Sequence, residues 1–187
     1  MKMPKSQKGF LFDQNFCIGC KACEVACQVY HQQEDMIDWR HVDTFLIREN
    51  NMEKEVYLSQ ACHHCQEPAC MSVCPTNAYT KRDDGIVILD RDKCIGCGYC
   101  MESCQYGAIT LQGNDKKAQK CNMCAEKQDI GELPACIAGC PVKALRLVDI
   151  VVADEAGMVK SAVGFKQSSL KPSIRFYPKF RSATFLG

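Results

Sequence analysis

Sixteen cysteines, arranged in four groups of four, constrain this 187-residue chain more than any other feature of its sequence. Every group follows one formula, C-x2-C-xn-C-x3-C, in which only the middle gap changes, taking 2, 4, 2 and 11 residues in turn. The four tetrads are, in chain order, Cys17, Cys20, Cys23 and Cys27; Cys62, Cys65, Cys70 and Cys74; Cys94, Cys97, Cys100 and Cys104; and Cys121, Cys124, Cys136 and Cys140. The repeat predicts four copies of one binding unit, with insertions only at the middle gap.

The cysteines are not expected to form disulfides. No apolar segment resembling a secretory signal precedes Cys17, and disulfides rarely persist in the cytosol. Most neighbours within a tetrad are three or four residues apart, a spacing that favours convergence on a shared centre over pairing across a fold.

Iron–sulfur clusters and zinc are the two metal centres that such a pattern could hold. Zinc sites usually take two well-separated C-x2-C pairs, an arrangement that only the fourth tetrad could imitate. The first and third tetrads instead match the C-x2-C-x2-C-x3-C run of bacterial ferredoxins. In the second and fourth tetrads, Cys74 and Cys140 are each followed by the proline that ends that run. Soft thiolates with no histidine in the repeat also favour iron and sulfide. We therefore predict four [4Fe–4S] clusters.

The expected fold class is α+β, with two ferredoxin-like units related by pseudo-twofold symmetry, rich in loops and organised around the four clusters. In two-cluster ferredoxins the fourth cysteine of each run binds the other cluster, so tetrads should exchange ligands in pairs. Tetrads two and three are joined by a predicted hairpin (78–81 and 86–89) and followed by a predicted strand (106–111) and a turn at 113–115. They form the predicted unit B, residues 61–111. Tetrads one and four pair only by elimination, in a discontinuous unit A, residues 10–60 and 112–150.

Composition supports the same prediction and excludes other classes. Hydrophobic residues are 47% of the chain, a class that includes cysteine. Without cysteine the share is roughly 38%, which is low for an ordinary core and suggests that clusters hold the fold together. The net charge is only +1, and no strongly basic stretch with interleaved aromatic residues occurs in the sequence. A nucleic-acid partner is therefore not expected. No apolar run approaches the roughly 18 residues that span a bilayer.

No residue is predicted to be catalytic. The sequence has no distinctive nucleophile–base pair, phosphate-binding glycine loop or paired-carboxylate motif. His63 and His64 lie within the second tetrad, where they either donate a hydrogen bond near a cluster or a partner or, as we favour, shape the loop. Trp39 is expected to fill a core or an interface. His31 and His41 receive no role.

At five places the chain resembles the four-cluster electron-transfer beta subunits of molybdopterin oxidoreductases, the family of dimethyl sulfoxide, polysulfide and thiosulfate reductases and formate dehydrogenase. The matching motifs are CIGCKAC at 17–23, CHHCQEPACMSVCP at 62–75, DGIVILD at 84–90 followed by CIGCGYC at 94–100, KCNMC at 120–124 and PACIAGCP at 134–141. The resemblance covers about residues 10–150.

The resemblance implies a ligand set for each cluster, with all sixteen cysteines as iron ligands. Site 1 would consist of Cys17, Cys20, Cys23 and Cys140, and site 2 of Cys27, Cys121, Cys124 and Cys136. Site 3 would consist of Cys62, Cys65, Cys70 and Cys104, and site 4 of Cys74, Cys94, Cys97 and Cys100.

The implied function is to relay single electrons between a molybdopterin-containing catalytic subunit and a membrane quinone-reactive subunit or soluble carrier. Substrate chemistry would then lie in a partner. Residues 151–187 are predicted to form an extended tail that docks on a partner. Without a signal peptide, the subunit is expected to assemble in the cytoplasm and to stay there or be exported folded with a partner, peripheral to the membrane. A free-standing soluble polyferredoxin and, more remotely, a zinc-stabilised interaction module remain alternatives.

Overall fold

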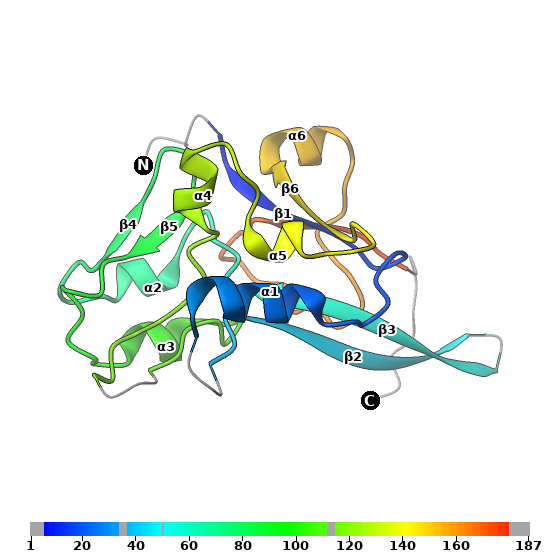
Figure 1. The fold of residues 1–187 in the computed structure, drawn as a ribbon, viewed down its shortest axis with the longest axis horizontal. Helices are drawn as coiled ribbons and strands as arrows, with labels where there is room; N and C mark the ends of the chain where they lie inside the picture. Colours follow the sequence, from blue (N-terminus) through cyan, green and yellow to red (C-terminus); the bar gives the residue numbers. More distant parts are fainter. Residues whose placement is uncertain (1–5, 34–36, 50, 112–114, 180–187) are drawn as a thin grey trace.

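The computed structural model describes residues 6–33, 37–49, 51–111 and 115–179 (Figure 1). Short helices and small sheets alternate along these ranges, which confirms the predicted α+β class. The strands are β1 (Lys8–Asp13), β2 (Arg40–Glu49), β3 (Met52–Ala61), β4 (Tyr79–Lys81), β5 (Val87–Leu89), β6 (Leu145–Asp149) and β7 (Ile174–Tyr177). The helices are α1 (Ala22–His31), α2 (Ala69–Ser72), α3 (Tyr99–Ser103), α4 (Ala125–Asp129), α5 (Ala135–Ala138) and α6 (Ile150–Glu155).

A three-stranded sheet, in the order β6-β1-β7, forms the centre of the main hydrophobic core. Strand β1 pairs antiparallel with β6 and parallel with β7. Its residues Phe10, Leu11 and Phe12 are all at most 2% exposed. A strand covered on both faces reads as a continuous apolar run, and this explains the sequence GFLF at 9–12.

Two antiparallel hairpins flank this sheet. Strands β2 and β3 pair along their whole lengths, from Arg40 opposite Ala61 to Glu49 opposite Met52, and Figure 1 shows them projecting from the body. Strands β4 and β5 pair from Tyr79 opposite Leu89 to Lys81 opposite Val87, which confirms the hairpin predicted over 78–89.

The strand predicted over 106–111 is wrong. This segment makes one isolated bridge, between Thr110 and Gln119, and no ladder. Gly107 has a φ of 60°, a left-handed conformation that interrupts an extended run directly after Cys104. Of the turn predicted at 113–115, residues 113 and 114 lie outside the described part of the chain.

The predicted extended tail is also wrong as far as the structure describes it, to residue 179. Strand β7 closes the free edge of β1 and brings Ile174 and Phe176 into the core, where they are 1% and 0% exposed. Helix α6 precedes it, with the Asp149 carboxylate capping the amide of Val151 at 2.8 Å. These residues belong to the body because β1 needs a partner at each edge. Within the described residues, no helix is long and apolar enough to cross a membrane.

Replacing Phe176 with alanine should therefore destabilise the protein. Its ring lies 4.8 Å from that of Phe165, centroid to centroid, and a Phe→Ala change in a core costs about 3–5 kcal/mol. For a chain of this length the midpoint of thermal unfolding should fall by roughly 10 °C, followed anaerobically by circular dichroism. Tyr177→Ala, on the same strand at 39% exposure, is the matched control and should change the midpoint little. Equal midpoints for the two variants would contradict the placement of β7.

Candidate metal centres

All four tetrads use the same local structure. The third cysteine of each lies in a short helix: Cys23 in α1, Cys70 in α2, Cys100 in α3 and Cys136 in α5. The x3 step carries the fourth cysteine about one helical turn further along, so that it leaves the loop formed by the first three. In the first and third tetrads, Gly19 and Gly96 have φ values of 69° and 71°, which let the loop curl over its thiols.

Site 1 is a hollow lined by Cys17, Cys20, Cys23 and Cys140, together with Ser59. Three of these cysteines come from the first tetrad and one from the fourth. Helices α1 and α5 pack closely enough to bring the two tetrads together at Gly139. A Cβ atom at this position would lie only 2.7 Å from that of Ala26.

Sites 3 and 4 are two further hollows that exchange cysteines in the same manner. The first is lined by Cys62, Cys65, Cys70 and Cys104, and the second by Cys74, Cys94, Cys97 and Cys100. Each therefore has three cysteines from one tetrad and the last cysteine of the other.

The remaining cysteines, those of site 2, are neighbours of one another. Burial raises the pKa of Cys27 to about 12, and Cys136 and Cys124 contribute to the rise. Burial also raises the pKa of Cys121 well above its usual value, helped by Cys27 and Cys136. Cys124 follows the same pattern, with a pKa raised to about 11 by burial and by Cys136. The two tetrads that supply site 1 thus also supply site 2.

The donor set fits a cluster of iron and sulfide. Burial, followed by the nearby thiols of Cys62 and Cys104, raises the pKa of Cys65 to about 12. Such groups stay protonated at neutral pH unless a cationic centre among them stabilises the thiolates. Backbone amides also point at the sulfurs, including those of Ala78 at Cys74 and Ala118 at Cys94, each at 3.4 Å. Thiolate sulfurs that accept amide hydrogen bonds are typical of iron–sulfur sites.

The four sites form a row. Cys136 of site 2 helps to raise the pKa of Cys23 in site 1, after burial. Cys121 of site 2 shares an apolar group with Cys62 of site 3. Tyr79 lines site 4 and has its pKa raised by burial, by Cys100 of that site and by two cysteines of site 3. Electrostatic influence or apolar packing therefore links site 1 to site 2, site 2 to site 3 and site 3 to site 4.

The two ends of this row reach the surface. Only Cys20 of site 1 and Cys97 of site 4 are classed as exposed among the sixteen cysteines. The cysteines of sites 2 and 3 are buried or half-buried.

His63 and His64 are both buried, at 1% and 0% exposure, and both line site 3. His64 shapes the loop as expected: its Nδ1 accepts a hydrogen bond from the Val87 amide at 3.0 Å, and its carbonyl accepts one from the Ser173 hydroxyl at 2.9 Å. The ring proton of His64 must then lie on Nε2. The ring of His63 packs edge-on against Tyr106, 4.5 Å away.

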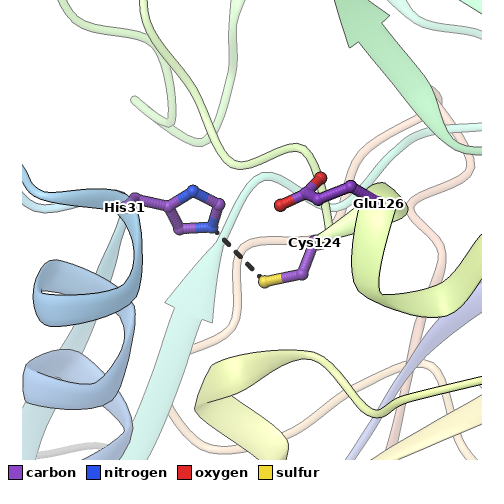
Figure 2. Close-up of side chains that lie close together, drawn as sticks. All are labelled: His31, Cys124 and Glu126. Atoms are coloured by element: carbon purple, nitrogen blue, oxygen red, sulfur yellow. Dashed lines mark hydrogen bonds between the residues drawn. The ribbon is translucent and has the colours of Figure 1, made fainter. Parts of the chain in front are cut away.

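His31 is a site residue to which the sequence pattern assigned no role. Figure 2 shows its ring pointing at Cys124, with Nε2 3.3 Å from Sγ and the Glu126 carboxylate close by. Burial lowers the pKa of His31, so the ring is neutral at neutral pH. The sequence contains a signal that His31 lies near the cysteines of site 2. His31 follows Cys27 by four residues on α1, so the two residues share one face of the helix. Trp39 packs against this ring at 4.6 Å, in agreement with its predicted packing role.

Comparison with known proteins finds the same chemistry. A family described as a 4Fe-4S dicluster domain matches residues 51–150, and a second family with that description matches residues 16–78. One chain of the anaerobic dimethyl sulfoxide reductase of Escherichia coli is 37% identical over 148 residues, which cover 75% of the present protein and 72% of the relative. One subunit of the tetrathionate reductase of Salmonella typhimurium is 36% identical over 139 residues, or 73% of the present protein and 56% of the relative.

A third relative is the formate dehydrogenase iron-sulfur subunit of Haemophilus influenzae, 33% identical over 154 residues, which cover 73% of the present protein and 49% of the relative. The two family matches together contain all four tetrads. The three relatives are each one chain or subunit of an oxidoreductase, and their names give different substrates. The protein therefore belongs to the 4Fe-4S dicluster family, as an iron–sulfur electron-transfer subunit of the kind found in these oxidoreductase complexes.

Proposed function

We propose that this protein relays single electrons through four [4Fe–4S] clusters between a molybdopterin-containing catalytic subunit and a membrane quinone-reactive subunit or soluble carrier. The observation that carries this proposal is the exchange of cysteines between tetrads around three separate hollows. Each cluster would accept and release one electron, and the protein would bind, space and insulate the clusters. Substrate chemistry would take place in the partner, as the names of the relatives suggest.

The proposed ligand sets are those of sites 1 to 4, with four thiolates at each. Sites 3 and 4 would belong to one ferredoxin-like unit, residues 61–111, and sites 1 and 2 to a second, residues 10–60 and 112–150, related by pseudo-twofold symmetry. Three hollows, each with three cysteines from one tetrad and one from another, support this scheme, because two-cluster ferredoxins share ligands in the same way.

Electrons would arrive at one end of the row and leave at the other. The exposed Cys20 is flanked by Phe16 and Ile18, at 54% and 59% exposure. The exposed Cys97 is flanked by Ile95 and Tyr99, at 67% and 56% exposure. Exposed apolar side chains beside an electron-transfer centre are suited to a protein interface that excludes water. We propose that each end docks a different partner and that the complex places this subunit at the periphery of a membrane.

Purified anaerobically, the protein should be brown and contain about 16 iron atoms and about 16 acid-labile sulfides per chain. Removing the iron with a chelator should also unfold much of the chain, because its core depends on the clusters. Iron and sulfide analysis with circular dichroism measures both. A colourless protein that contains zinc and no sulfide would contradict the proposal.

Two double substitutions should distinguish shared ligands from separate tetrads. Cys17→Ser with Cys140→Ser should damage one cluster, because both residues belong to site 1. Cys17→Ser with Cys27→Ser should damage two clusters, although both residues lie in the first tetrad. Iron content and electron paramagnetic resonance count the clusters that remain. The opposite result, in which the second pair damages one cluster and the first pair two, would show that each tetrad binds its own cluster.

Phe16→Glu and Tyr99→Glu should each weaken one partner contact and leave the clusters intact, because neither side chain lines a hollow. Placing a charge in a desolvated interface opposes docking, so electron transfer to one partner should slow at least tenfold in each variant. Val152→Glu, on α6 at 62% exposure, is the control and should have no effect. Normal co-purification and normal rates with both end variants would overturn the proposed docking surfaces.

A further inference from the structure

The first residue of β2, Arg40, is a cation enclosed in the protein. It is 2% exposed and stands first among the largest fully buried side chains of the described residues. Two other cationic side chains are buried in that part of the chain, Lys120 and Arg175. Arg175 pairs with a carboxylate, since its Nη2 lies 2.8 Å from Oδ2 of Asp154. Arg40 and Lys120 have no such ion pair among the described residues.

Arg40 is also short of hydrogen-bond acceptors. Its Nη1 donates to the Ser59 hydroxyl at 2.9 Å. Its Nε and Nη2 are buried without any partner among the described residues. Lys120 differs, because its ammonium donates to the backbone carbonyls of Val87 and Cys121. An enclosed guanidinium with two unused donors is costly unless negative charge lies close by.

The negative charge that the structure offers is that of the cysteine sulfurs. Ser59, the hydrogen-bond partner of Arg40, lines site 1, and its Oγ lies 3.5 Å from Sγ of Cys23. Burial alone would lower the pKa of Arg40, but neighbouring thiolates raise it instead. They come from three cysteines of site 2 and one of site 1, namely Cys136, Cys121, Cys27 and Cys23. The backbone geometry agrees, because Ala61, which pairs with Arg40 across the β2–β3 hairpin, packs in one apolar group with Cys121 of site 2. Arg40 therefore faces both sites.

The guanidinium is held in place from the other side. Its Cζ lies 4.5 Å from the centroid of the Phe10 ring, an aromatic face that attracts a cation and fixes its position. Arg40 also stands opposite Ala61 in the β2–β3 hairpin, directly before Cys62. Because an arginine stays charged at all physiological pH values, this position holds a permanent charge with little freedom to move.

We propose that Arg40 is the shared counter-cation of sites 1 and 2, whose charge raises the reduction potentials of the two clusters held there. The inference rests on the proposed function, since it requires clusters at these sites. Four thiolates and an oxidised cluster carry a net charge of roughly −2, and reduction adds one more negative charge. A fixed cation in a low-dielectric interior stabilises the reduced form more than the oxidised form.

The test is a redox titration of the whole protein, followed by electron paramagnetic resonance, on variants that separate charge from shape. Arg40→Gln and Arg40→Met remove the charge, and Arg40→Lys keeps it. Arg48→Gln is the matched control, because Arg48 lies on the same strand, carries the same charge and has a side chain that is 53% exposed. Iron and sulfide content is measured first for the wild type and for every variant.

In the neutral variants, two of the four midpoint potentials should become more negative. At a fixed potential, the ratio of reduced to oxidised cluster should fall at least tenfold. That change corresponds to about 59 mV for a one-electron step. Arg40→Lys should keep most of the wild-type value, and Arg48→Gln all of it. Both neutral variants could instead fail to bind clusters at sites 1 and 2 while Arg40→Lys binds them. That result would also support Arg40 as their counter-cation, because these sites would then need a positive charge to hold their clusters.

The proposal is overturned if a neutral variant carries four clusters with wild-type potentials. It is equally overturned if the lysine and neutral variants shift alike or fail alike, because shape rather than charge would then explain Arg40. A wild-type protein without iron and sulfide would instead contradict the proposed function itself. The iron and sulfide analysis, made before the titration, distinguishes that result from a failure of the Arg40 proposal.

Discussion

The cost of burying cysteine thiolates close to one another is the constraint on which this structure depends. Sixteen cysteines on a chain of this length cannot all be buried as anions. Burial and neighbouring thiols raise the pKa of Cys27 to about 12 and that of Cys124 to about 11. A core of this composition is stable only if each group of sulfurs binds a cationic centre. The loops, the short helices and the small sheets are arranged around that requirement.

Because the hollows exchange cysteines between tetrads, a cluster bound in each would act as a cross-link. Site 1 connects the loop at 17–23 with Cys140, and site 3 connects the loop at 62–70 with Cys104. Closing such long loops replaces part of the apolar burial that a chain with few hydrophobic residues lacks. This explains how helices of four residues, such as α2 and α5, can be stable here although they are too short to be stable alone.

Features that depend on the local spacing of residues could be predicted from the sequence. Features that depend on contacts between distant residues could not. The cysteine formula predicts that tetrads exchange cysteines in pairs, as they do around three hollows, and the DG turn predicts the β4–β5 hairpin. Strand β7 was missed because IRFY at 174–177 forms a strand by pairing with β1, which lies more than 160 residues earlier in the chain. Arg40 was missed for a similar reason, since nothing in WRHV at 39–42 shows that two distant tetrads surround it.

In the proposed relay, the outer and inner sites would obtain electrostatic stabilisation from partly different sources. A reduced cluster gains negative charge, and water or a fixed cation can stabilise that charge. The outer sites reach water at Cys20 and Cys97, where the chain is exposed. The cysteines of site 2 are all buried, and those of site 3 are buried or half-buried. Among the described residues, two buried cations have no carboxylate partner. Arg40 faces site 2 as well as site 1, and Lys120 lies at site 3, where its charge partly offsets the rise in the pKa of Cys70 caused by burial and by Cys62. Solvent at the ends of the row and buried cations in its middle would both stabilise added negative charge, so that no inner centre of the proposed relay would lack a source of such stabilisation.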